Sequence, residues 1–151
     1  KCNLSDVNSI EGTIKDVLAV SGPIDGFVFC SGITSSRPFK MAKYEAMLNV
    51  MNINFFSFVE IVRCITKKGC YADNLSRINT IAPGTTDTPM FREAEKDFGS
   101  DSSAFASRLE RQYLGLCKPE DIANSVAFLL SNMSRMITGS CLGVDGGKLT
   151  S

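Results

Sequence analysis

The feature that most constrains the fold is a short apolar run that stops abruptly at a proline and a glycine. Residues 78–82 read Ile-Asn-Thr-Ile-Ala, a β-branched and mostly apolar stretch typical of a buried strand. Pro83 cannot donate to a sheet ladder, and Gly84 permits a sharp turn. Residues 85–88, Thr-Thr-Asp-Thr, then place hydroxyls and a carboxylate where open α/β sheets bind ligands. A strand followed by a plain polar turn explains the same residues.

Helical and strand patterns alternate along the rest of the chain. Apolar residues at helical spacing predict a helix from about Val7 to Ser21, and the apolar run 26–30 predicts a strand covered on both faces. A long helix, bent or interrupted, is expected over about 43–67, another helix opens at Pro119, and 141–144 is a short strand. The alternation predicts one Rossmann-type domain over the whole chain, a doubly wound parallel sheet in a three-layer α/β/α arrangement. The helix faces expected to be buried carry Phe55, Phe58, Val59, Val62 and Ile65, and then Ile122, Val126, Leu129 and Leu130.

Composition excludes several classes of protein. Sixteen Lys and Arg balance sixteen Asp and Glu, and no dense basic run exists, so we expect no nucleic-acid partner. No apolar run approaches the ~18 residues that cross a bilayer, so we expect no membrane partner. The six cysteines form no C-x-x-C pair, which favours free thiols in a reducing, cytoplasmic compartment. Because the chain has no histidine, a Ser-His-Asp or Cys-His mechanism within it is excluded, and no metal site is predicted.

Several stretches together resemble the short-chain dehydrogenase/reductase family, in that family's order. The segment from Asn79 to Gly84, with Thr88 beyond it, resembles the family's N-x-x-x-P-G-x-x-x-T segment, and residues 137–147 resemble its last strand, i-T-G … v-D-G-G. The resemblance, closest to 3-oxoacyl-(acyl carrier protein) reductases, implies an oxidoreductase that uses NAD or NADP on a small-molecule carbonyl or alcohol substrate. It also implies a homodimer or homotetramer. Nothing in the sequence selects the substrate.

The resemblance also implies roles for particular residues. Asn54 matches the family asparagine that lies at an irregularity of the long helix and holds a water of the proton relay, with Asn52 as the competing position. An asparagine buried and satisfied by backbone is an equal explanation. Thr86 and Thr88 match residues that contact the nicotinamide carboxamide and a phosphate oxygen. The other implied cofactor-binding residues are Asn3 and Leu4 at the adenine, Cys30, Ser31 and Gly32 at the adenosine ribose, and Pro83 and Gly84 at the bend. A turn before a helix cap explains Asn3 as well.

Two parts of the family pattern are absent. The glycine-rich turn that holds the pyrophosphate is missing, and so is the Tyr-x-x-x-Lys pair. The residues four places after the three tyrosines are Leu48, Leu75 and Cys117. We therefore predict that the sequence is part of a longer chain, with ~50 residues before Lys1 and ~40 near Gly69 and Cys70 not represented. The alternative is a non-catalytic nucleotide-binding protein, or a structural subunit, that lacks these residues.

The polar region from Phe91 to Arg111 falls where the family has its substrate lid. Its composition predicts partial helix with a break at 99–103. Phe91, Phe98, Phe105 and Tyr113 could line an apolar pocket, and ordinary helix packing explains them equally well.

Overall fold

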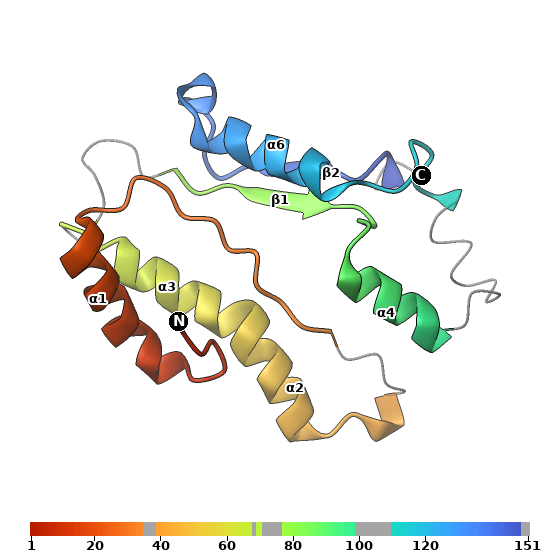
Figure 1. The fold of residues 1–151 in the computed structure, drawn as a ribbon, viewed down its shortest axis with the longest axis horizontal. Coiled ribbons are helices and arrows are strands. Elements are labelled where there is room, and N and C mark those ends of the chain that lie inside the picture. The colour runs from red at the N-terminus through yellow and green to blue at the C-terminus, as the bar shows by residue number, and fades with distance from the viewer. Residues whose placement is uncertain (35–38, 68, 71–76, 99–109, 149–151) are drawn as a thin grey trace. The chain divides into compact units, whose positions relative to one another are not determined.

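A computed structural model describes residues 1–34, 39–67, 69–70, 77–98 and 110–148 of the 151 (Figure 1). The chain divides into two compact units, Lys1–Ser76 and Arg77–Ser151, and each is described by itself. A single domain over 1–151 stays a prediction.

The N-terminal unit begins with a short 3-10 turn, Val7–Ser9, that leads into helix α1, Ile10–Ser21. The helix ends as the sequence predicts, because Gly22 adopts a positive φ of 75° and donates its N–H to the Leu18 carbonyl at 2.9 Å.

The long helix of this unit is interrupted in its middle. Its parts are α2, Tyr44–Met51, a π-helical turn, Asn52–Phe56, and α3, Ser57–Ile65. A 3-10 turn, Phe39–Met41, precedes it. A π turn inserts one residue into the helical ladder and is frequent at functional sites. The interruption therefore lies where the family resemblance expects it.

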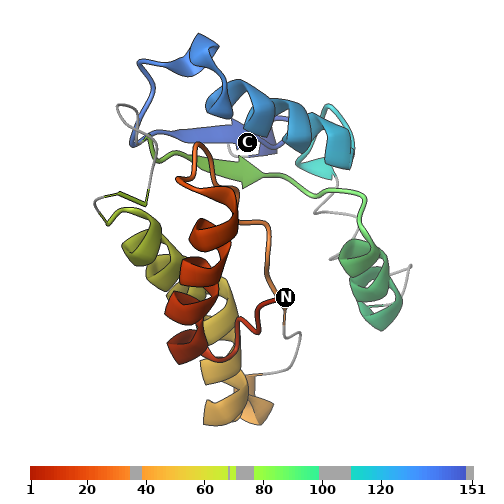
Figure 2. The same cartoon turned by 60° about the vertical axis from the view of Figure 1, so that its left-hand side comes forward.

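Helix α1 packs along α3 (Figure 2). The buried residues are Ile10 of α1 and Ser57, Ile61 and Cys64 of α3, which recur at helical spacing. The face predicted to be buried is wrong in part, since Phe55 is 50% exposed and Val59 44% exposed. The side of α3 that faces α1 is the one that is covered, and the described residues leave much of the opposite apolar side open.

The predicted strand over 26–30 is not formed as a strand. The run pairs with no other strand among the described residues, and Val28 is exposed. A lone strand has no ladder to stabilise it. The run does pack on the long helix, since the ring centroids of Phe29 and Phe58 lie 5.5 Å apart.

One helix is long and apolar enough to cross a membrane by length and composition alone. It is Tyr44–Ile65, with 22 residues and a hydropathy of 1.3. The sequence prediction that no segment meets this criterion is therefore wrong. The core helix of a globular protein meets the same criterion, and one such helix is a weak indication of a membrane span.

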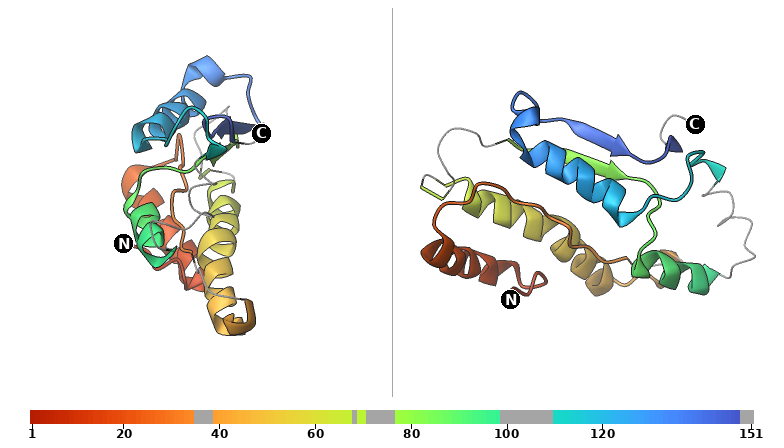
Figure 3. Two further views of the ribbon diagram at one scale, coloured as in Figure 1. Left: turned by 90° about the vertical axis from the view of Figure 1, so that its right-hand side faces the viewer. Right: turned by 45° about the horizontal axis from the view of Figure 1, so that its top comes forward.

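The C-terminal unit is built on two parallel strands. Its elements are β1, Thr80–Pro83, α4, Pro89–Phe98, α6, Pro119–Leu130, a 3-10 turn, Asn132–Ser134, and β2, Cys141–Val144. Thr80 lies opposite Cys141 and Pro83 opposite Val144. Helix α6 lies along both strands (Figure 3, right). The predicted helix start at Pro119 is confirmed, and the Asp121 carboxylate accepts the Lys118 N–H at 2.8 Å.

Pro83 belongs to β1 although it has no N–H. Thr80 and Gly84 donate to the carbonyls of Ser140 and Val144 at 2.9 Å each. Alternate residues of β1 therefore direct their N–H groups at β2, and Pro83 falls on the other edge, where that ladder needs no donor.

Arg77 fastens the start of this unit to the end of α6. Its guanidinium donates to the carbonyls of Leu129 at 2.7 Å, Ser134 at 3.1 Å and Ser131 at 3.2 Å. A cation suits the carbonyl-rich end of a helix.

Leu130, predicted to be buried in α6, is 49% exposed, because the helix turns its other residues towards the strands.

Asn79 fastens β1 to the segment before β2. Its side chain donates to the Ile137 carbonyl at 3.0 Å and accepts the Ser140 N–H at 3.1 Å. Asn79, the asparagine of the predicted motif, therefore links the start of β1 to the segment that leads into β2.

Candidate cofactor-binding site

The bend after β1 has no room for a side chain at Gly84. A Cβ there would lie 2.7 Å from the Asp145 Cα, 2.8 Å from the Asp145 carbonyl oxygen and 2.7 Å from Gln112 Oε1. Two of these atoms belong to backbone and cannot rotate away. Glycine at this position is therefore required by close approach of the chain beyond β2.

Gln112 holds the residue after that glycine by both of its backbone groups. Its Oε1 accepts the Thr85 N–H at 2.7 Å, and its Nε2 donates to the Thr85 carbonyl at 3.0 Å and to the Gly115 carbonyl at 2.7 Å. The side chain is only 2% exposed. A buried amide with its acceptor and donors satisfied fixes the position of the groups it binds.

The backbone of Cys117 continues the bend as a short parallel bridge with Thr86. The Cys117 N–H donates to the Thr85 carbonyl at 3.0 Å, and the Cys117 carbonyl accepts the Asp87 N–H at 2.9 Å. In a trans peptide the N–H points opposite to the preceding C=O, so the Thr86 N–H is directed away from Gln112 and Cys117. Among the residues that the structure describes, it has no hydrogen-bond partner.

Thr86 and Thr88 present hydroxyls on either side of Asp87. The Thr86 hydroxyl donates to the Gly84 carbonyl at 3.1 Å, which leaves its oxygen able to accept. The Thr88 hydroxyl accepts the Phe91 N–H at 3.2 Å and so caps α4. Asp87 binds Arg92 at 2.8 Å, and this guanidinium lowers the pKa of the Asp87 carboxyl.

In the N-terminal unit, Asn54 holds Ile33 in the same way. Its Oδ1 accepts the Ile33 N–H at 2.8 Å, and its Nδ2 donates to the Ile33 carbonyl at 2.9 Å. Gly32 again precedes the held residue, and a Cβ there would lie 3.6 Å from Asn54 Oδ1. Asn54 lies in the π turn, so the structure brings two of the predicted residues, Asn54 and Gly32, together.

The remaining predicted residues of this unit lie in exposed or half-buried coil. The side-chain oxygen Oδ1 of Asn3 accepts the Ser5 N–H at 3.2 Å and the Ser5 hydroxyl at 2.8 Å, as in a turn that precedes a helix. Leu4 is half-buried, and Cys30 and Ser31 are exposed. Their contacts with adenine and ribose stay predictions. Asn52, the competitor of Asn54, reaches only the Ser5 carbonyl, at 3.5 Å.

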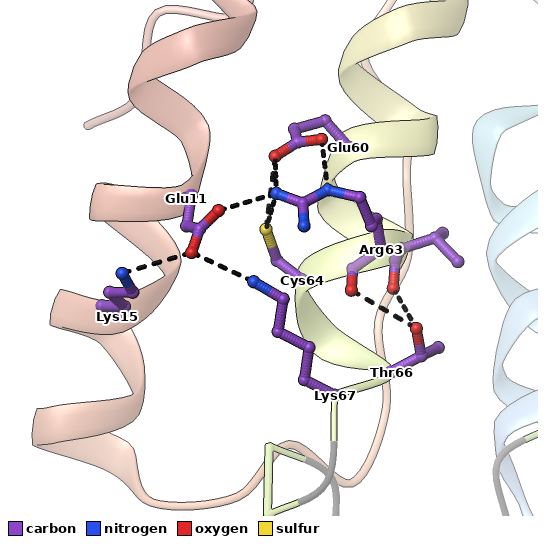
Figure 4. Close-up of polar contacts among 8 residues, drawn as sticks. Glu11, Lys15, Glu60, Arg63, Cys64, Thr66 and Lys67 are labelled. Atoms are coloured by element: carbon purple, nitrogen blue, oxygen red, sulfur yellow. Dashed lines mark hydrogen bonds and ion pairs between the residues drawn. The ribbon is translucent and has the colours of Figure 1, made fainter.

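A cluster of Glu11, Glu60 and Cys64 joins α1 to α3, with its ligand atoms within 4.8 Å of one another (Figure 4). Arg63 donates to Glu11 at 2.7 Å, and Lys67 to Glu11 at 3.0 Å. These cations lower the pKa of Glu11 to about 2, while burial raises the pKa of the Cys64 thiol. Because cations already occupy the carboxylate, the cluster is an ion-pair network that links two helices.

Sequence reasoning missed Gln112. It stands between Arg111 and Tyr113 in a stretch with no pattern that marks it. The only signal lies elsewhere, in the glycines that make room for it: a Cβ at Gly146 would lie 2.6 Å from Gln112 Cγ. Glycines in a D-G-G segment indicate close packing, but the sequence alone does not say against which residue.

The predicted lid can be followed only in part. Helix α4 confirms the predicted helix at its start, and Phe91 is half-buried. The predicted break at 99–103, Phe105 and the side chain of Phe98 lie outside the described residues. Tyr113 is 73% exposed and lies against Gly147, so it packs on the D-G-G turn.

Both halves of the chain match models of known protein families. Residues 69–148 match the model described as enoyl-(acyl carrier protein) reductase, and residues 1–74 match the model described as short chain dehydrogenase. The chain belongs to the short-chain dehydrogenase/reductase family, as the motifs predict.

Curated relatives agree with this assignment. A cis-4-hydroxycyclohexanecarboxylate dehydrogenase of Sinomonas cyclohexanicum is 37% identical over 78 residues, which cover 51% of this chain and 29% of the relative. A 3beta-hydroxysteroid dehydrogenase 1 of Eggerthella lenta is 42% identical over 78 residues, 51% of this chain and 28% of the relative. The chain therefore spans under a third of the length of these two relatives.

A third relative, an uncharacterised oxidoreductase of Schizosaccharomyces pombe, aligns along the whole chain. It is 26% identical over 193 positions, which take in 99% of this chain's 151 residues and 73% of the relative. About 43 aligned positions therefore have no residue in this chain.

Solved structures confirm the predicted fold class. The ligand-free aldohexose dehydrogenase of Thermoplasma acidophilum superposes with a TM-score of 0.81 at 23% identity, over 100% of this chain and 78% of that one. An actinorhodin polyketide ketoreductase variant solved with NADPH superposes with a TM-score of 0.80 at 18% identity, over 97% and 76% of the two chains. The fold is thus Rossmann-type, and the chain covers about three quarters of each of these two structures.

Proposed function

We propose that the intact protein is an NAD(P)-dependent oxidoreductase that transfers hydride between a nicotinamide and a small or acyl ketone or its alcohol. The observation that carries the proposal is the Thr86 N–H, which no described residue binds, beside the hydroxyl of the same residue. A primary carboxamide has one carbonyl acceptor and two N–H donors, so it matches this pair of groups. The turn after β1 therefore suits a nicotinamide carboxamide whose carbonyl oxygen faces the Thr86 N–H and whose N–H group faces the Thr86 hydroxyl oxygen.

Thr88 supports the same assignment. Its hydroxyl oxygen accepts from the Phe91 N–H, and its hydrogen stays available to a phosphate oxygen. When bound, the cofactor supplies or accepts the hydride, and the work of the chain is to bind and orient it. Asn54 serves through the backbone that it fixes at Ile33, since both ends of its amide are already used there.

The proton donor of the reaction is assigned to polypeptide that these 151 residues do not contain. We infer a further segment of ~40 residues close to Gly69 and Cys70 that carries the serine and the Tyr-x-x-x-Lys. The two family-model matches meet at residues 69–74, which supports this placement. About 43 positions of the alignment with the Schizosaccharomyces pombe relative have no residue here, which supports a segment of this length. The mass of the protein isolated from its source tests it: 16.4 kDa would refute the segment.

Activity and binding are tested together. NADH and NADPH are titrated into the intact protein by fluorescence, and their oxidation is followed against a panel of small ketones, diketones and acyl ketones. Turnover supports the proposal. Binding without turnover favours the non-catalytic nucleotide-binding alternative, and absence of binding refutes both.

The proposed assembly and location follow from the family and the composition. We expect a cytoplasmic homodimer or homotetramer, and Met133 and Met136, both exposed, are the kind of apolar side chains that a subunit contact covers. Light scattering of the purified protein gives the oligomeric state directly.

A further inference from the structure

The geometry points to Gln112 as a positioning residue for the nicotinamide: its amide sets the orientation of the Thr85–Thr86 peptide and so aims the Thr86 N–H. This inference rests on the proposed function. It concerns a residue that none of the sequence motifs contains.

The first step is the geometry of the amide. A glutamine amide is planar, with its acceptor on one side and its donors on the other, so it can pair with the N–H and the C=O of one residue at once. Gln112 does so with Thr85, at 2.7 Å and 3.0 Å. The N–H of Thr85 belongs to the Gly84–Thr85 peptide and its C=O to the Thr85–Thr86 peptide, so two bonds from one rigid amide hold both peptide planes. A single bond would hold only one of them.

The second step is the effect on Thr86. The Thr85 carbonyl receives Gln112 Nε2 and the Cys117 N–H, and both lie on one side of the peptide. The peptide is trans, so the Thr86 N–H leaves on the opposite side. If the amide of Gln112 is removed, the Thr85 carbonyl keeps only the Cys117 bond, and the direction of the Thr86 N–H is held by the Cys117 bridge alone.

The third step is that the surroundings are shaped for this side chain. Gln112 lies in contact range of Gly84 and Gly146, and a Cβ on either glycine would approach it to 2.7 Å and 2.6 Å. Gln112 Nε2 also reaches the Gly115 carbonyl, which ties the returning chain to the bend. The two glycines make room for the side chain, and a glutamine that only filled this space would not need its bonding pattern.

The fourth step is the parallel with Asn54. That asparagine, in the π turn, holds Ile33 by its N–H and its C=O. A glycine, Gly32, again precedes the held residue, although a Cβ there would lie at an ordinary contact distance of 3.6 Å from Asn54 Oδ1. The sequence motifs single out Asn54. The structure shows that Gln112 makes the same kind of contact in the C-terminal unit.

The test compares a ligand that contains nicotinamide with one that lacks it. The probes are whichever of NADH or NADPH the intact protein binds, and ADP-ribose or its 2′-phosphate to match. Gln112→Met keeps the size of the side chain and removes its hydrogen bonds. We expect the Kd of the reduced cofactor to rise at least about tenfold, and the Kd of the ADP-ribose probe to stay within about threefold.

The control is Arg77→Lys. It destabilises the same unit at the end of α6, without contact to Thr85 in the described residues, so it should lower Tm and leave both Kd values unchanged. Gln112→Glu, with the same shape and the same acceptor for the Thr85 N–H, is the second variant if Gln112→Met does not fold. It should raise the Kd of the reduced cofactor for the same reason, because its second oxygen faces the Thr85 carbonyl.

Each possible result of these Kd measurements supports or overturns the inference. Equal changes in both Kd values, or none in either, would show that Gln112 is only structural and overturn the inference. Equal affinity of the unaltered protein for the two probes would overturn it too, while dinucleotide binding would stand. If the unaltered protein binds neither probe, the proposed function fails, and the inference fails with it.

Discussion

Alanine at Gly84 should destabilise the protein by a steric route that can be calculated from the structure. Its Cβ would lie 2.7 Å from the Asp145 Cα and 2.8 Å from the Asp145 carbonyl oxygen, both of which are backbone. Gln112 Oε1, the third neighbour at 2.7 Å, cannot move without losing the Thr85 N–H. Relief of the overlap therefore requires the chain after β2 to separate from the bend.

The expected loss is at the upper end of what overpacking costs, about 3 kcal/mol. For a chain of this length each kcal/mol shifts Tm by about 2–4 °C, so Tm should fall by roughly 6–12 °C. Thermal unfolding followed by circular dichroism measures the shift.

Gly143→Ala is the matched control. Gly143 lies in β2, the strand that pairs with β1, and a Cβ there would meet nothing within 4 Å. The same substitution should leave the free energy of unfolding unchanged or raise it by up to about 1 kcal/mol, because alanine restricts the unfolded chain. Tm should therefore stay the same or rise slightly. If the two variants unfold at the same temperature, the close approach at Gly84 is not a constraint and the reasoning fails.

Three further predictions concern other contacts. Glu11 has a folded pKa of about 2 against an ordinary 4.5, so its stabilisation is fully present above about pH 4.5 and lost as the pH falls towards 2; urea unfolding of Glu11→Gln should show a shallower acid loss than the unaltered protein, and identical slopes would contradict this. Arg77→Leu removes the charged donor shared by the carbonyls of Leu129, Ser131 and Ser134, each of which keeps another donor, and should cost about 3 kcal/mol, whereas Arg92→Leu removes an exposed ion pair worth less than about 1 kcal/mol; similar unfolding midpoints would refute the contrast. Asn54→Ala frees the Ile33 backbone and should lower kcat at least about tenfold while it changes the cofactor Kd less, so a loss confined to Kd would argue against a role of Asn54 in turnover.

Much of the fold follows from local sequence. Pro83 and Gly84 end β1, Gly22 ends α1 and Pro119 opens α6, because each acts on its own backbone. Such features need no distant partner. They are therefore readable in one sequence without any knowledge of packing.

The errors concern features that depend on distant residues. Residues 26–30 have the composition of a strand, yet a strand requires a neighbour to pair with. The buried side of α3 is set by where α1 lies, so Phe55 and Val59 remain half-open although the apolar pattern includes them. Periodicity shows that a helix has an apolar face and leaves open what covers it.

The same distinction between local features and features that depend on distant residues holds for the side chains of the site. Thr86 and Thr88 can be proposed from sequence, because hydroxyls after a strand are a local pattern. Gln112 cannot, because it acts on Thr85 from 27 positions away, and its only traces in the sequence are Gly84 and Gly146, the glycines that make room for it. A side-chain amide is suited to this task since it is neutral and matches one residue's N–H and C=O together. It can immobilise a binding turn without adding a charge that would compete for the ligand, which leaves the next N–H to do the binding.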